Sequence, residues 1–244
     1  MSYYKNYCLD DVVAVMSFDR LRYNVRFNML EIAIVTLNGD LSKYVLLEKS
    51  RDHRVSSHPS DNDLLNSSTN KNRYSKTILN EFEEIYGKIS ECTISDIMFN
   101  LKLMLKHYAH IVDNPRVAIV NARRQDHYLK LYRIPFIDLN YYDYDSVKTN
   151  NNITWEISTF VNIFLQNFEC RFHSPSADKN ECVVVNVFMQ AVWLSINAKS
   201  ETTGTNWTAI IKSLANKISP NLNGTFCEIN AGINLFTIDN NNVQ

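Results

Sequence analysis

The stretch NVRFNMLEIAIVTLNGDLSKYVLLE, residues 24–48, decides which fold the sequence predicts. From Val25 to Leu37 every second side chain except Glu31 is apolar, which is the two-residue period of a half-buried strand. Asn38-Gly39 follows this strand, and the pair is the strongest short signal for a hairpin turn. Residues 43–48 predict the returning strand, so the sequence indicates an antiparallel hairpin at the centre of the fold.

Segments on both sides of this hairpin predict further strands and several helices. Residues 50–74 are polar and form the longest expected loop. We expect helices over 3–17, 76–90, 96–111 and 206–217, and strands over 116–122, 127–134, 154–172, 182–197, 225–229 and 232–238. This pattern predicts an α+β fold, an antiparallel β-sandwich with an N-terminal helical arm and helices packed outside. We expect residues 1–17 to form the arm and 18–244 to form a single β-sandwich domain with helices.

Composition narrows the class of protein. The 244 residues carry 25 Lys and Arg against 26 Asp and Glu, a net charge of −1, which gives no electrostatic case for nucleic acid or an anionic membrane. A nearly neutral chain favours self-association instead. No apolar run reaches the roughly 18 residues of a membrane span. The first residues lack a signal-peptide layout, and Ser2 excludes myristoylation. Five widely spaced cysteines suggest free thiols in a reducing cytosol.

The N-terminal segment is a candidate for assembly. Tyr4, Cys8, Val12 and Val15 would share one stripe of a helix over 3–17. Such an arm could reach a neighbouring subunit, or the helix could pack on its own domain.

Candidate catalytic residues are weak. A cysteine-dependent hydrolase would use Cys170 with His173, or Cys182, with Asp178 as the orienting group. Cys170 and His173 are three residues apart and would lie on opposite faces of a strand, so a core cysteine beside a surface histidine fits better. We therefore predict no catalytic residues.

Metal and phosphate sites are also weakly indicated. His107 and His110 could share a helix face, but no Cys or carboxylate four residues further on completes a metal site. With five glycines in the chain, no phosphate-binding loop is present. We expect neither a metal nor a required cofactor.

Arginines and tyrosines suggest contacts between subunits. The row Arg20, Arg22 and Arg26 suits an extended edge that makes salt bridges or stacking contacts between subunits. This row or the pair Arg123-Arg124 could contact a nucleotide, although basic residues this sparse are usually solvated. Tyrosine is enriched at protein contacts and titrates near pH 10. The cluster Tyr141, Tyr142 and Tyr144 is therefore our candidate for an alkaline switch that releases an assembly.

The C-terminal part resembles the end of cypovirus polyhedrins, the occlusion-body proteins of insect viruses. Helix 206–217, then Ile218-Ser219-Pro220-Asn221, then Glu228-Ile229-Asn230 and a last strand follow in the same order and spacing. The resemblance implies a structural protein that forms trimers and crystals around virus particles in the host cytoplasm and dissolves at alkaline pH. It implies no enzyme activity, no membrane and no specific nucleic acid, and it implies that a nucleotide can be bound. Another viral or host interaction module, or a cysteine-dependent hydrolase, remain the alternatives.

Overall fold

The computed structural model describes residues 8–22, 27–49, 94–120, 122–142, 144, 154–168, 182–198 and 206–217. The predicted loop over 50–74, the predicted helix over 76–90 and the predicted strands over 225–229 and 232–238 lie outside these residues.

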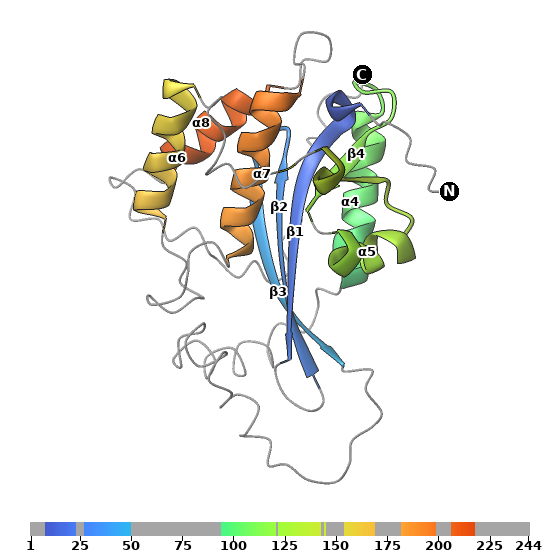
Figure 1. Cartoon of the computed structure of the whole chain (residues 1–244). Helices are drawn as coiled ribbons and strands as arrows, with labels where there is room; N and C mark the ends of the chain where they lie inside the picture. The colour runs from blue at the N-terminus through green and yellow to red at the C-terminus, as the bar shows by residue number, and fades with distance from the viewer. Residues whose placement is uncertain are drawn as a thin grey trace, which may run out of the picture.

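A single five-stranded sheet forms the centre of the fold, in the order β3-β2-β1-β4-β5 (Figure 1). The strands are β1 (Val12–Arg22), β2 (Phe27–Thr36), β3 (Leu41–Lys49), β4 (Arg116–Ile119) and β5 (Phe136–Asp138). β2 pairs antiparallel with both β1 and β3, whereas β4 pairs parallel with β1 and with β5. The sheet is therefore mixed, with β2 running against the other four strands.

The predicted hairpin is confirmed as β2 and β3. Val35 pairs with Leu41, and the turn between them is closed by hydrogen bonds between Thr36 and both Gly39 and Asp40. Gly39 has a φ of 76°, which a residue with a Cβ adopts at a cost, so the glycine is required there. Local turn chemistry thus fixes this part of the fold.

The predicted N-terminal helix is wrong over the residues that the structure describes. Leu9–Asp11 form a short 3-10 helix, η1, and Val12 begins β1, the middle strand of the sheet. β1 is buried on both faces from Val12 to Phe18, and its first five residues, Val12–Met16, form an apolar run without a two-residue period. The strand also runs across residues 17 and 18, where we expected the arm to end and the domain to begin.

The predicted α+β class is confirmed, but the described strands form one mixed sheet in place of the expected sandwich, and three expected strands are helical. Residues expected as strands at 127–134, 154–172 and 182–197 belong largely to α5 (Ala122–Leu131), α6 (Trp155–Asn167) and α7 (Val183–Asn197). α7 contains many β-branched residues and is buried on most of its surface, so its periodicity is weak. The Thr154 side chain accepts a hydrogen bond from the Ile157 N–H and marks the start of α6.

Three further described elements agree with the sequence prediction, whereas β5 lies where we expected no strand. α4 (Ile94–Tyr108), α8 (Trp207–Lys217) and β4 fall where we expected two helices and a strand. Asn206 caps α8, since its Oδ1 accepts a hydrogen bond from the Ala209 N–H.

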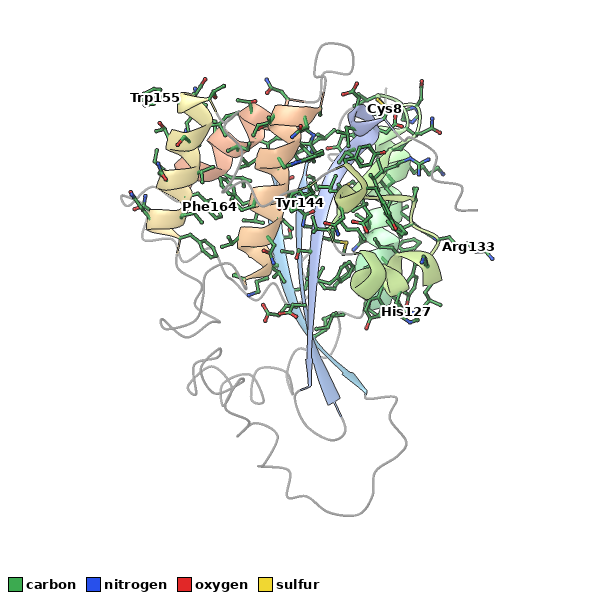
Figure 2. The ribbon with its side chains drawn as sticks, viewed as in Figure 1. Cys8, His127, Arg133, Tyr144, Trp155 and Phe164 are labelled. Atoms are coloured by element: carbon green, nitrogen blue, oxygen red, sulfur yellow. The ribbon has the colours of Figure 1, made fainter. Side chains whose placement is uncertain are left out.

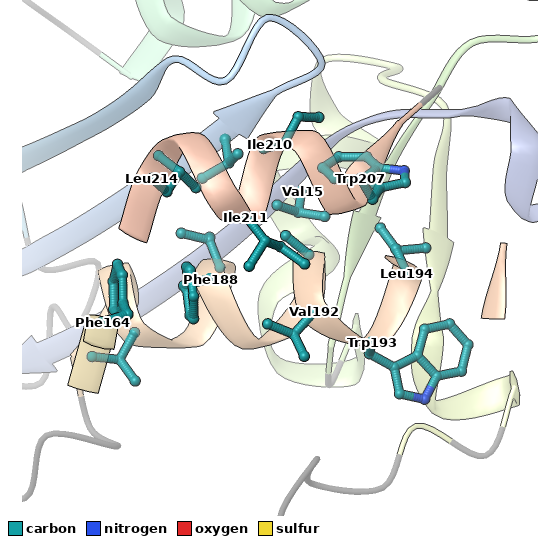
Figure 3. Packing of buried hydrophobic residues seen from close by; sticks show 14 of the residues in the cluster. Val15, Phe164, Phe188, Val192, Trp193, Leu194, Trp207, Ile210, Ile211 and Leu214 are labelled. Atoms are coloured by element: carbon teal, nitrogen blue, oxygen red, sulfur yellow. The ribbon is translucent and has the colours of Figure 1, made fainter. Parts of the chain in front are cut away.

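Helices cover both faces of the sheet (Figure 1). α4 and α5 lie on one face, and α6, α7 and α8 lie on the other. On the second face Phe164 of α6 stacks on Phe188 of α7, with ring centroids 3.6 Å apart, and Trp207 of α8 is buried in the same cluster (Figure 3). The sheet is therefore the middle of three layers.

Truncating the aromatic stack tests this packing. We expect Phe188→Ala to lower the free energy of unfolding by about 3–5 kcal/mol, because it leaves a cavity between α6 and α7. The control Phe99→Ala, in an exposed position on α4, should change it by less than about 0.5 kcal/mol. Urea denaturation of both variants measures the difference, and equal effects would contradict the described packing.

Candidate functional site

The topology points to one place on the sheet for a ligand. In open sheets with parallel strands, ligands bind outside the carboxyl ends of those strands, where the strand order reverses. Here the chain leaves β1 toward β2 and β3 and returns to β4 on the other side of β1, so the reversal lies between β1 and β4. β4 ends at Ile119 while β1 continues to Arg22. A ligand is therefore expected along β1 from Met16 onward.

Apolar side chains fill this position on the α4–α5 side of the sheet. Met16, Phe18 and Ile119 are buried there. The Phe18 ring stacks on Tyr128 of α5, with centroids 6.0 Å apart. The usual place for a ligand is therefore packed as core.

Polar groups occupy the same part of the sheet on the α7 side. Gln190 of α7 is 2% exposed and donates a hydrogen bond from Nε2 to the Met16 carbonyl, 3.4 Å away. Met16 lies one residue past Val15, the last residue of β1 that pairs with β4, so the glutamine side chain takes the place of a strand partner. Gln190 thus ties α7 to the strand that both layers share.

A buried ion pair lies on the neighbouring strands. Lys43 Nζ of β3 is 2.9 Å from Glu31 Oε2 of β2, and both side chains are at most 2% exposed. Removing one partner of such a pair leaves a buried charge and is strongly destabilising. This pair, like Gln190, connects elements inside the core.

The outward side of α4 has a different character. Its inward side is buried against the sheet, while Phe99, Leu103 and Lys106 follow one another at intervals of four and three residues on the opposite side and are exposed. Phe99 is 60% exposed, an unusual value for a phenylalanine.

α5 extends this surface. His127, Lys130 and Leu131 are exposed, and the Tyr132 hydroxyl lies 2.6 Å from Ser95 Oγ at the start of α4. This hydrogen bond joins the two helices at one end. We give the name α4–α5 face to these exposed residues of the two helices and of the segments that follow them: Phe99, Lys102, Leu103, Lys106, His107, His110, Ile111, His127, Lys130, Leu131 and Arg133.

Both charge and apolar exposure gather on this face. Residues 94–142 contain seven Lys and Arg against four Asp, a charge of +3, which leaves −4 for the rest of the chain. Four of the six exposed large hydrophobic residues in the described part of the chain also belong to the face. Asp96 and Asp113, near the two ends of α4, are exposed acidic residues of the same segment. The face therefore combines positive charge with apolar contacts.

Arg133 has an unusual backbone. Its φ is 54°, and no other residue except Gly39 has a positive φ among those described. It lies just after α5, where the Ile134 N–H donates to the Leu129 carbonyl and the Arg133 N–H donates to the Lys130 carbonyl. This pattern is a Schellman motif, whose left-handed position is usually glycine. An arginine in this left-handed conformation lowers the free energy of unfolding by roughly 1–2 kcal/mol. Its side chain points away from the body of the protein (Figure 2).

The proposed assembly residues do not form one exposed stripe. Val12 and Val15 are fully buried in β1, while Cys8 is exposed, with its Sγ 3.4 Å from Asp10 Oδ2. Tyr4 lies outside the described residues. We predicted the stripe from the spacing of residues in a helix. Val12 and Val15 lie in a strand instead, so that spacing does not apply to them.

The three tyrosines of the proposed switch have different surroundings. Tyr141 is 50% exposed and Tyr142 is partly buried, both in the 3-10 helix η2 (Leu139–Tyr142). Tyr144 packs against Trp193 of α7 with centroids 5.8 Å apart, and burial raises its pKa to about 12. Sequence reasoning missed Tyr108, whose hydroxyl donates to Asn38 Oδ1 over 2.7 Å. Its pKa is also raised, by burial and then by Asp40.

The remaining candidates are only partly described. Cys170, His173 and Asp178 lie outside the described residues, whereas Cys182 is buried at the N-cap of α7. His107 and His110 are exposed on the α4–α5 face, and the described residues contain no group of three side chains that could hold a metal ion. Arg20 and Arg22 lie in β1 and Arg123 and Arg124 in α5, while Arg26 is outside the described residues.

Tyr144 gives the fold a dependence on alkaline pH. Because its folded pKa of about 12 exceeds the unfolded value near 10, its contribution to stability is complete below pH 10 and is lost as pH rises through 12. We expect this one group to account for about 2–3 kcal/mol of that loss. Tyr144→Phe should lose less stability than the parent between pH 10 and 12, measured by urea denaturation. The control Tyr141→Phe should follow the parent, and a Tyr144→Phe curve that also follows it would remove Tyr144 as the cause.

Comparison with protein-family models, with curated proteins and with solved structures finds no match for this chain. Among the described helices, none combines the length and apolar composition that crossing a membrane requires.

Proposed function

We propose that this chain is a non-enzymatic binding module that holds an anionic partner on its α4–α5 face. The observation that carries the proposal is the gathering of exposed lysines, arginine and histidines with exposed apolar side chains on one pair of helices. Apolar surface rimmed by polar groups is typical of interaction sites. Clustered positive charge attracts an anionic partner and speeds its association.

The packing at the strand ends supports a binding role over catalysis. Met16 and Phe18 fill the part of β1 where a sheet of this kind would present a ligand, and Gln190 binds the backbone there from the other side. Catalysis at that position would require these side chains to move aside. The α4–α5 face, by contrast, is open to a partner as it stands.

The occlusion-body function implied by the polyhedrin resemblance stays a prediction. The lattice contact that we expected for it used a helix whose residues Val12 and Val15 lie inside the sheet. A crystal-forming role would therefore need other surfaces of the chain, and intracellular crystals on expression would be its direct test.

A matched pair of charge reversals tests the binding module. Immobilised heparin serves as a polyanion, and we expect the protein to be retained at low salt although its net charge is negative. Lys106→Glu on α4 should lower the salt concentration needed for elution, because it reverses a charge within the face. Lys212→Glu on α8 changes the net charge equally on the other side of the sheet and should shift elution much less. Equal shifts, or no retention of the parent, would contradict the proposal.

A further inference from the structure

We infer that the anionic partner is an acidic amphipathic helix of another protein, which lies across α4 and α5 with its apolar side on Phe99, Leu103 and Leu131 and a carboxylate on Arg133. This inference rests on the proposed function and adds the class of partner to it.

The apolar residues favour a helix over a nucleic acid. Leu103, Ile111 and Leu131 are aliphatic, and Phe99 is the only exposed phenylalanine, tyrosine or tryptophan of the face. Single-stranded nucleic acids bind through bases stacked on several aromatic rings, which this face does not offer. Phe99 and Leu103 are one turn apart on α4, and such a row packs into the grooves of another helix.

The charges of the α4–α5 face specify the sign of the charge that the partner helix carries. Lys102 and Lys106 are exposed on α4, each three residues after Phe99 and Leu103 respectively, so a partner with Asp or Glu beside its apolar stripe is complementary. A basic or neutral amphipathic helix could match the apolar contacts but not these lysines. Charge therefore selects among helices that the apolar row alone would accept.

Arg133 supplies the most specific contact. It occupies a left-handed position that glycine fills without strain, and it directly follows Leu131 and Tyr132, beside the start of α4. Strained residues of this kind gather at binding sites, where the side chain gives something that the favoured residue would not. A guanidinium binds a carboxylate through two parallel hydrogen bonds, which an ammonium cannot do.

The test uses three labelled probes and measures fluorescence anisotropy. The first probe is a synthetic helical peptide with Leu on one face and Glu elsewhere, the second is the same composition scrambled to remove the apolar face, and the third is a single-stranded RNA oligonucleotide. We expect the ordered peptide to bind at least about tenfold more tightly than the scrambled one, a difference set by the apolar face. Leu103→Ser should reduce that preference.

Arg133→Gly should change thermal stability and peptide binding in opposite directions. We expect the melting temperature to rise by about 2–4 °C, because glycine relieves the left-handed strain. We expect binding of the ordered peptide to weaken about fivefold in the same variant, as one charged hydrogen-bonded contact is lost. Arg133→Lys keeps both the positive charge and the left-handed strain. Its affinity for the ordered peptide should lie between those of the parent and Arg133→Gly, and its melting temperature should not rise.

The outcomes separate this inference from the proposed function. Retention on heparin with no preference for the ordered peptide overturns the helix partner and leaves the binding module intact. Tighter binding of the RNA than of the ordered peptide assigns the face to nucleic acid. Self-association that Lys106→Glu abolishes assigns it to a second copy of this chain. Unchanged peptide binding by Arg133→Gly removes Arg133 from the contact.

Discussion

The structure depends on the burial of β1 on both of its faces. Val12 and Val15 face the α6–α8 layer, and Met16 and Phe18 face α4 and α5, so each helical layer is held through this one strand. Among the strands that the structure describes, β1 alone pairs with both the antiparallel hairpin, through β2, and the parallel pair, through β4. Because β4 is short, the backbone of β1 beyond Val15 needs another partner, which Gln190 provides at the Met16 carbonyl.

The same constraint explains which elements the sequence could predict. The β2–β3 hairpin was predictable since its turn requires local chemistry at Asn38-Gly39, and α4 was predictable since one side of it faces solvent. β1 and α7 lack such a side. A strand or helix that is buried all round has no clear period, and the many valines of α7 then favour a strand by propensity alone. The two largest errors in the predicted fold therefore have one physical cause.

The candidate site was less predictable than the fold. A net charge of −1 averages a positive segment, residues 94–142, with a negative remainder, and only the folded chain shows that Lys106 and Lys130 are exposed and that Tyr132 contacts Ser95 of α4. Exposure of Phe99 and Leu131 is likewise a property of the folded chain. The left-handed backbone of Arg133 has no signal in sequence, since the position after a helix is recognisable only when glycine or asparagine occupies it.

The two helical layers differ in how much of their apolar surface is exposed. α7 has almost no exposed surface and closes the core between β1 and α8, so substitutions there act first on stability. α4 closes the core with one side only, and on the other side Phe99 is 60% and Leu103 is 38% exposed. Apolar side chains in contact with water lower solubility, and an arginine in a left-handed position lowers stability. Neither feature benefits the isolated fold. A partner that covers Phe99, Leu103 and Leu131 and neutralises Arg133 would account for both features at once, which is why we propose a binding surface on α4 and α5 and not at the strand ends.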